Sequence, residues 1–304
     1  MKLISVKKRT AALVLAGVLA LTAVGTSYYH AQAASASTIT TVQTGVKVLS
    51  NTKASVDASN LSEGFVMVKY TGGKNVRIKV QITKSGGTTY TYNLNNSGTY
   101  ETFPLTEGDG TYSIKVYENT SGTKYATAYS TSVTMKLRDP FLPFLYPNQY
   151  VNFTDTSTTV AKGKEITQGK TTDLAKVEAI FNWVTTNFTY DYKLAANPPT
   201  GYLPDVDKVL AARKGICFDY SAVMAAMLRS QNIPCKLVIG YAGTVYHAWI
   251  DVYIQGTGWV KGAIYFDGKN WTLMDPTFVS TGKGSMSIMK YVTTASNYSA
   301  KYAY

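Results

Sequence analysis

The sequence is poor in histidine and cysteine, and both shortages restrict the chemistry it can carry. Among 304 residues there are two histidines and two cysteines. His30 lies in an N-terminal segment that we expect to be removed, which leaves His247 as the one histidine of the mature chain. A metal site built from several histidines is therefore excluded, and imidazole chemistry must use His247. Two cysteines are few for an exported fold held by disulfides, although spacing alone leaves a bridge between Cys217 and Cys235 open.

Long apolar runs are also lacking, except near the N-terminus. Ala11–Val24 is apolar but short and rich in small residues, it follows Lys2, Lys7, Lys8 and Arg9, and Ala31-Gln32-Ala33 offers a cleavage pattern. These features predict a secretory signal peptide over 1–33 and a mature chain that begins near Ala34. The alternative is an uncleaved membrane anchor, for which the stretch is too short. We expect a secreted, extracellular or cell-wall-associated protein with no stable membrane insertion after cleavage.

Negative charge is scarce. The chain has 30 lysines and arginines against 18 acids, for a formal charge of +12, and the signal segment holds four of these positive charges. The mature charge is therefore nearer +8 (12 − 4), which favours polyanionic surroundings such as a bacterial wall or an acidic substrate. No basic run is interleaved with aromatics, so a nucleic-acid partner is not expected. No cofactor or metal motif is present, and no acidic calcium loop.

Residues 61–138 alternate apolar and polar side chains with a period of two. Turn residues such as Gly72-Gly73, Gly86-Gly87 and Asn95-Asn96 separate the alternating runs. Short strands at this spacing predict an all-β, immunoglobulin-like sandwich. The Ser/Thr-rich residues 34–60 are expected to form a linker or a loose strand. Three prolines among aromatics between Asp139 and Asn148 mark a domain boundary, so we assign a Pro/aromatic linker to 139–160 that packs against the protein.

Residues 161–304 change to a helical period and then to strands, which predicts an α+β domain. Helices are expected over about 174–188, 205–212 and 217–231, and strands over 236–241, 246–254 and 271–274. The tail after Phe278 has no clear pattern.

Three residues of this domain fit one mechanism of nucleophilic catalysis. Cys217 stands at the predicted start of a helix, where unpaired N–H groups and the helix dipole favour a thiolate and could later bind an oxyanion. His247 lies on the more polar face of a predicted strand, and Asp275 ends the next one. His247 would take the thiol proton and Asp275 would orient the imidazole. Each residue alone also has a structural explanation, as a buried thiol, a strand histidine or a turn former.

Two other aspartates are weaker candidates for the orienting role. Asp251 is four residues from His247 on the same strand, well over 10 Å along it at about 3.3 Å per residue. Asp267 sits in a Gly-rich turn, whose formation accounts for it.

Four segments together resemble the transglutaminase-like superfamily. They are Gly215-Ile216-Cys217-Phe218-Asp219-Tyr220-Ser221, the run Leu228–Pro234, His247-Ala248-Trp249, and Trp271 with Asp275-Pro276-Thr277. Phe181–Val184 and Phe188–Asp191 are similar to the helix that leads into its core. The order Cys, His, Asp is similar to that of compact bacterial members, and the resemblance covers about 160–280. It implies a papain-like core of helices packed on an antiparallel sheet, a Cys217–His247–Asp275 triad and a covalent thioester.

The resemblance also implies that Cys235 is a buried thiol and not a disulfide partner of Cys217. Trp183 and Tyr202 are candidates for the acceptor site or the oxyanion site, although a core role suits Trp183 better. The reaction favoured is hydrolysis of peptide or isopeptide bonds in a protein or peptide substrate, such as a cell-wall or surface protein. The alternatives are protein cross-linking with an amine acceptor, glycopeptide deglycosylation, and a non-catalytic cell-surface binding module.

Overall fold

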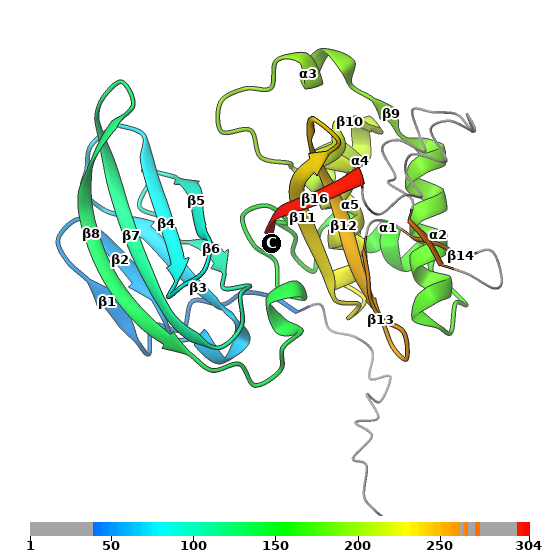
Figure 1. Cartoon of the computed structure of the whole chain (residues 1–304), viewed down its shortest axis with the longest axis horizontal. Coiled ribbons are helices and arrows are strands. Elements are labelled where there is room, and N and C mark those ends of the chain that lie inside the picture. The colour runs from blue at the N-terminus through cyan, green and yellow to red at the C-terminus, as the bar shows by residue number, and fades with distance from the viewer. Residues whose placement is uncertain (1–38, 262–263, 267–270, 274–296) are drawn as a thin grey trace, which may run out of the picture. The chain divides into compact units, whose positions relative to one another are not determined.

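The computed structural model describes residues 39–261, 264–266, 271–273 and 297–304, which all fall within the unit Ser35–Tyr304. Asp275 and Asp267 lie outside the described residues. No helix in these ranges is long and apolar enough to cross a membrane. The unit contains an all-β part followed by a part that mixes helices with antiparallel strands (Figure 1).

The all-β part consists of two four-stranded antiparallel sheets, in the orders β1-β2-β3-β6 and β5-β4-β7-β8. Their strands are β1 (Val48–Ser50), β2 (Ala54–Asp57), β3 (Phe65–Tyr70), β4 (Ile78–Lys84), β5 (Thr89–Leu94), β6 (Glu101–Pro104), β7 (Gly110–Ser121) and β8 (Lys124–Met135). Alternate side chains of β5 and β7 are buried, as a strand with one face on a core requires. Between the sheets, Tyr92 of β5 packs edge-on against Phe103 of β6 at 4.8 Å. The predicted sandwich is therefore present.

The sandwich begins earlier than the sequence predicts. Residues 34–60 are expected as a linker or a loose strand, but β1 and β2 lie there, β2 pairs with β3, and the 3-10 helix η1 (Leu61–Glu63) follows. Ala54, Val56 and Asp57 are fully buried. Two short strands in a Ser/Thr-rich stretch give little period-two signal, which is why the sequence pattern misses them.

The linker packs against the rest of the unit, as its aromatics predict. The 3-10 helix η2 (Leu142–Phe144) is buried with Leu145. Arg229, at 1% exposure, donates hydrogen bonds to three carbonyl oxygens: Cys235 at 2.9 Å, Tyr146 of the linker at 2.9 Å and Tyr304 at 2.6 Å. One buried guanidinium therefore connects the linker, a strand and the last residue of the chain.

The second part packs helices around α5. The helices are α1 (Thr158–Ile166), α2 (Asp173–Asn187), α3 (Tyr192–Ala196), α4 (Val206–Ala212) and α5 (Cys217–Arg229), and nearly all of α5 is buried. Beside α5 lies an antiparallel sheet in the order β13-β12-β11-β16, formed by β11 (Cys235–Ala242), β12 (Val245–Ile254), β13 (Gly258–Val260) and β16 (Tyr298–Ala303). Two small pairs complete the part: β9 (Thr189–Tyr190) with β10 (Lys214–Gly215), and β14 (Ile264–Phe266) with β15 (Trp271–Leu273).

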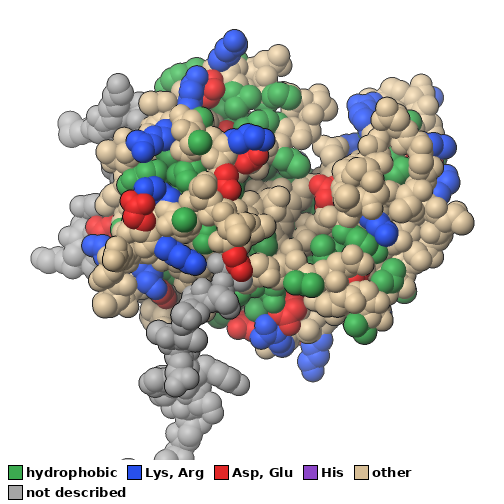
Figure 2. Space-filling view, turned by 180° about the vertical axis from the view of Figure 1, so that it is seen from behind, with side chains coloured by type: hydrophobic (Ala, Val, Ile, Leu, Met, Phe, Trp, Pro, Cys, Tyr) green, Lys and Arg blue, Asp and Glu red, His purple; other side chains and the backbone are tan. Residues whose placement is uncertain are grey.

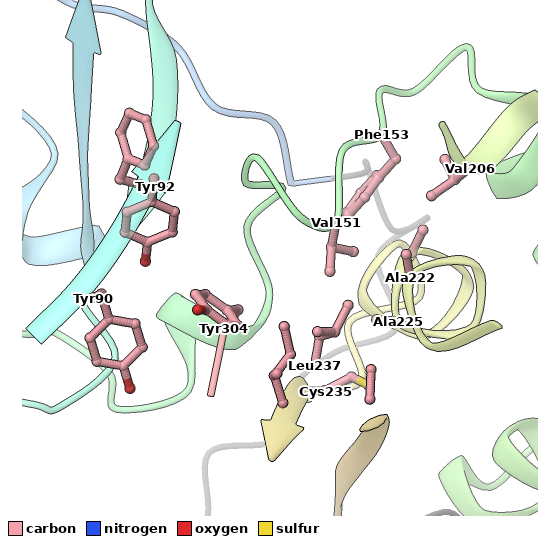
Figure 3. Packing of buried hydrophobic residues seen from close by; sticks show 14 of the residues in the cluster. Tyr90, Tyr92, Val151, Phe153, Val206, Ala222, Ala225, Cys235, Leu237 and Tyr304 are labelled. Atoms are coloured by element: carbon pink, nitrogen blue, oxygen red, sulfur yellow. The ribbon is translucent and has the colours of Figure 1, made fainter. Parts of the chain in front are cut away.

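The strand β16 is absent from the sequence prediction, which gives the tail no pattern. It pairs with β11, about sixty residues earlier in the chain. Tyr304 follows it, exchanges two backbone hydrogen bonds with Leu237 and is 3% exposed. Its ring lies 5.4 Å from Tyr90 of the sandwich, so this residue joins the cores of both parts (Figure 3).

Candidate functional site

Cys217 occupies the first position of α5, as the sequence predicts, and it is partly exposed while most of the helix behind it is buried. Gly215 is needed just before it, because a Cβ there would lie 2.5 Å from the Cβ of Asp219. Asp219 folds back over this glycine, and its Oδ2 accepts a hydrogen bond from the Ile216 N–H at 2.8 Å. The start of the helix, and with it the position of Cys217, is therefore fixed by a glycine and an acidic residue in the first turn.

Asp219 is completely buried, and its second oxygen, Oδ1, accepts a hydrogen bond from the Tyr202 hydroxyl at 2.7 Å. Burial raises the pKa of Asp219, and the hydrogen bonds from Ile216 and Tyr202 act in the opposite direction. Burial and the neighbouring Asp219 carboxyl raise the pKa of Tyr202, which therefore stays a hydrogen-bond donor at neutral pH.

His247 lies near the start of β12, where it pairs with Gly240 of β11 and is 5% exposed. Its ring stacks over Trp249, two residues along the same strand face, with centroids 6.5 Å apart and planes 25° apart. Gly240 makes room for this arrangement: a Cβ there would meet Ser299 O at 2.1 Å and Trp249 Cη2 at 2.9 Å. The next residues, Ala248 and Ile250, alternate with this face and belong to the hydrophobic core.

Cys217 and His247 line the same cavity, of about 630 Å³, which we name the Cys217 cavity. Its other lining residues are Asn93, Gln149, Tyr150, Tyr190, Ala195, Pro198, Pro199, Gly201, Tyr202, Leu203, Ile216, Phe218, Ile239, Val245, Tyr246 and Ala248. No lysine, arginine, aspartate or glutamate is among these residues. Such a space suits a neutral group, for example the carboxamide of a peptide or side chain, next to a thiol and an imidazole.

Several residues that line this cavity are not predicted from the sequence. Asn93 comes from the sandwich, Gln149 and Tyr150 come from the linker, and no local pattern distinguishes them. Tyr246 is 57% exposed at the rim; its pKa is raised by partial burial, by Tyr302 and Tyr241, and by the nearby Cys217.

Of the other candidates named from the sequence, one lines the Cys217 cavity and one does not. Tyr202 lines the cavity, whereas Trp183 is absent from its walls and packs edge-on against Phe188 at 6.0 Å. The core role expected for Trp183 agrees with this position. In the register of β11 and β12, Asp251 lies opposite Lys236, and it is four positions along β12 from His247.

Cys235 is a free, fully buried thiol, and Cys217 is free as well, so the two form no disulfide. Burial raises the pKa of Cys235 to about 12, which makes it an inert thiol at neutral pH. Among the residues that the structure describes, no group of three or more His, Cys, Asp or Glu side chains is placed to hold a metal ion.

Comparisons with known proteins agree with the resemblance noted in the sequence. Residues 160–276 match the family model described as the transglutaminase-like superfamily. An uncharacterized protein, YebA, of Bacillus subtilis is 30% identical over 116 residues, which are 32% of this chain and 16% of that protein. The human kyphoscoliosis peptidase is 27% identical over 128 residues, which are 38% of this chain and 17% of that protein. The chain thus spans about a sixth of each of these relatives.

A solved structure described as a candidate cysteine protease from Cytophaga hutchinsonii is similar over 85% of this chain and 74% of its own, with 15% identity and a TM-score of 0.41. A TM-score of 0.41 is too low to establish a shared fold, so the fold described above rests on the helices and strands of this chain.

Proposed function

We propose that residues 160–276, which match the model of the transglutaminase-like superfamily, form a thiol acyl-transfer enzyme and that Cys217 is its nucleophile. The observation that carries the proposal is that Cys217, at the first position of α5, and His247, on β12, line one cavity. A helix N-terminus favours negative charge on the sulfur and on a developing oxyanion, and an imidazole on the same cavity can exchange a proton.

The reaction proceeds in two steps. The Cys217 sulfur attacks the carbonyl carbon of an amide, His247 takes the thiol proton, and the C–N bond breaks as the imidazole delivers that proton to the leaving amine. The product of this step is a thioester on Cys217. Water then attacks the thioester carbonyl and gives a proton to His247, and the thiol is regenerated as the carboxylic acid leaves. In this account Asp275 orients the imidazole, a role that comes from the sequence resemblance.

Hydrolysis of peptide or isopeptide bonds is the outcome that we favour. The name of one matched relative, the human kyphoscoliosis peptidase, supports this choice. An amine in place of water would give an isopeptide bond and make the protein a cross-linking transglutaminase.

The test is an acyl-transfer assay with the purified protein in reducing buffer. A casein-type substrate is supplied with and without a fluorescent primary amine, beside Cys217→Ala and Cys235→Ala variants. Cleavage that needs Cys217 but not Cys235 is the expected result. Amine incorporation with the same dependence would establish cross-linking. If neither occurs and Cys217 fails to react with iodoacetamide near neutral pH, the enzyme proposal is wrong and a binding module takes its place.

We also propose that the protein acts outside the cytoplasm, on the basis of the basic, apolar and small-residue pattern of residues 1–33. The mass of the exported protein tests this. A mature chain that begins near Ala34 is expected, and recovery of the uncleaved chain alone from cells would contradict it.

A further inference from the structure

A second cavity adjoins the Cys217 cavity and differs from it in charge. It has a volume of about 510 Å³, and we name it the acidic cleft. Its lining residues are Thr41, Met67, Tyr100, Glu101, Thr102, Pro147, Asn148, Gln149, Asn152, Phe153, Thr154, Ser157, Leu203, Pro204, Asp205, Val206 and Asp207. Gln149 and Leu203 line both cavities, so these residues form a wall that the two spaces share.

Among the residues that the structure describes, three carboxylates line the acidic cleft and no lysine or arginine does. Asp205 is paired with Lys208 at 2.8 Å. Within the described residues, Glu101 and Asp207 have no lysine or arginine at ion-pair distance. The cleft is therefore negative in a chain whose formal charge is +12. Elsewhere the charges are mixed: Figure 2 shows basic side chains dispersed among acidic ones over one face, with no continuous basic patch.

Two buried side chains of the acidic cleft, one of which also lines the Cys217 cavity, each have one solvent-inaccessible polar atom without a partner among the described residues. Asn148, 4% exposed, accepts from the N–H groups of Tyr150 and Val151 through Oδ1, and no described residue bonds its Nδ2. Gln149, 9% exposed, donates through Nε2 to Asn93 O at 2.6 Å and to Glu101 Oε1 at 3.0 Å. Its Oε1 has no partner in the described part of the chain.

These bonds fix the orientation of both amides. The Asn148 oxygen and the Gln149 nitrogen are already engaged, so a flip of either amide would break hydrogen bonds that exist. The pair is left with one free donor and one free acceptor on adjacent residues. Buried polar atoms of this kind are rare.

The rim of the Cys217 cavity is apolar. Leu203, Val245 and Tyr246 line it and are 36%, 58% and 57% exposed, and Tyr241, 41% exposed, packs on Tyr246 at 5.5 Å. Exposed apolar side chains gathered at the mouth of a cavity indicate a surface that is covered when a ligand binds.

We propose that the acyl donor is an extended polypeptide that crosses from the Cys217 cavity, past Gln149, into the acidic cleft, where a basic side chain binds. Apolar residues next to the reacting amide contact the rim at Leu203, Val245 and Tyr246. A lysine or arginine of the substrate faces Glu101 and Asp207. The inference rests on the proposed function for the identity of the reacting atom and adds the class of substrate.

The first test measures binding without turnover. Fluorescein-labelled peptides carry a central Leu-Gln pair and, at one position two to four residues to either side, lysine, norleucine or glutamate. At about 3.3 Å per residue these positions reach roughly 7–13 Å from the centre. Fluorescence anisotropy with the Cys217→Ala protein is expected to show, at one position, binding about five- to tenfold tighter for lysine than for glutamate. Raising sodium chloride from about 0.05 to 0.5 M should reduce this preference, because salt screens partly exposed charges.

The second test assigns the preference to the acidic cleft. In the Cys217→Ala background, Glu101→Gln and Asp207→Asn each reduce the lysine preference, to less than about twofold when combined. Glu165→Gln is the matched control, because Glu165 is on α1 outside both cavities and pairs with Lys162. Unchanged melting temperatures show that the variants fold. Equal binding of the lysine, norleucine and glutamate peptides, or a preference that survives both substitutions, overturns the inference.

Turnover by the unsubstituted protein separates this inference from the proposed function. If peptides are cleaved through Cys217 without a lysine preference, the proposed function stands and the proposed binding of a basic side chain in the acidic cleft is wrong. If lysine peptides bind preferentially but none forms a thioester, the acidic cleft stands as part of a polypeptide-binding site and the proposed function is wrong.

Discussion

The hydroxyl of Tyr202 donates a hydrogen bond to Asp219 Oδ1 at 2.7 Å, and this bond connects the wall of the Cys217 cavity to the first turn of α5. Asp219 Oδ2 holds the Ile216 N–H at the same time, so one buried carboxyl positions both the loop that carries Tyr202 and the residue before Cys217. The geometry around Cys217 thus depends on a side chain that does not itself line the cavity.

Tyr202→Phe is expected to destabilise the protein by about 1–3 kcal/mol, because it leaves a buried carboxyl oxygen without its partner. Urea unfolding measures the change. Tyr192→Phe is the matched control, since Tyr192 is 69% exposed and the same substitution there should change stability by less than about 0.5 kcal/mol. Equal effects at the two tyrosines would show that the bond to Asp219 contributes little.

Gly240→Ala is expected to destabilise the protein by at least about 2 kcal/mol and to reduce activity. The new Cβ would meet the backbone oxygen of Ser299 and the ring of Trp249, which stacks beside His247. Gly87→Ala is the control: the nearest atoms to its Cβ would be the carboxylate of Glu107, which is the flexible end of a side chain, and the Cβ of Lys84 at 3.2 Å. Thermal unfolding and acyl transfer are compared, and a Gly240→Ala protein as stable and active as the Gly87→Ala protein contradicts the packing described here.

Arg229→Met is expected to destabilise the protein by about 3 kcal/mol or more, because three carbonyl oxygens, those of Tyr146, Cys235 and Tyr304, lose their donor. Burial lowers the pKa of Arg229 to about 10, yet the guanidinium stays charged at neutral pH. Arg77→Met provides the comparison, since Arg77 is exposed and donates to a single carbonyl, that of Gly122. A loss below about 1 kcal/mol at both arginines would contradict a central role for Arg229.

The stability of the sandwich is expected to fall in acid through Glu118. Burial alone would raise the pKa of Glu118, but hydrogen bonds from Tyr70, Lys53 and Lys74 lower it from 4.5 to about 2. Because the folded pKa is the lower one, the stabilisation is present above pH 4.5 and is lost as the pH falls toward 2. With partly exposed lysines we expect a loss of about 1–2 kcal/mol.

The free energy of unfolding is measured by urea titration at pH values between 5 and 2. The Glu118→Gln protein should lack this part of the pH dependence. An identical slope in the two proteins would show that other carboxyls govern acid unfolding.

Strong local signals in the sequence predict most of the elements that position the site. The helical period behind Thr172 predicts α2, the Gly215 stop and the apolar run after it predict α5, and alternation predicts β11 and β12. These elements are long or strongly periodic, so local pattern is enough.

Other elements depend on partners far away in the chain. The strand β16 carries little pattern of its own and is fixed by pairing with β11 and by the burial of Tyr304. The helix α1 begins with two threonines and contains Gly163, where a Cβ would lie 3.1 Å from Met227 Cβ, so close packing and not propensity determines it. Asn93 and Gln149 reach the cavity from the sandwich and the linker, which no local motif reveals. The role of Asp275 stays a prediction.

The most direct test of the central claim is to trap the acyl-enzyme. The protein is mixed with a peptide substrate, quenched in acid within the first turnovers and digested, and the mass of each cysteine-containing peptide is measured. The account predicts an acyl adduct on the peptide that contains Cys217, present in the Cys235→Ala protein and absent from the Cys217→Ala protein. Substrate turnover with no adduct on Cys217, or turnover that persists in Cys217→Ala, would contradict it.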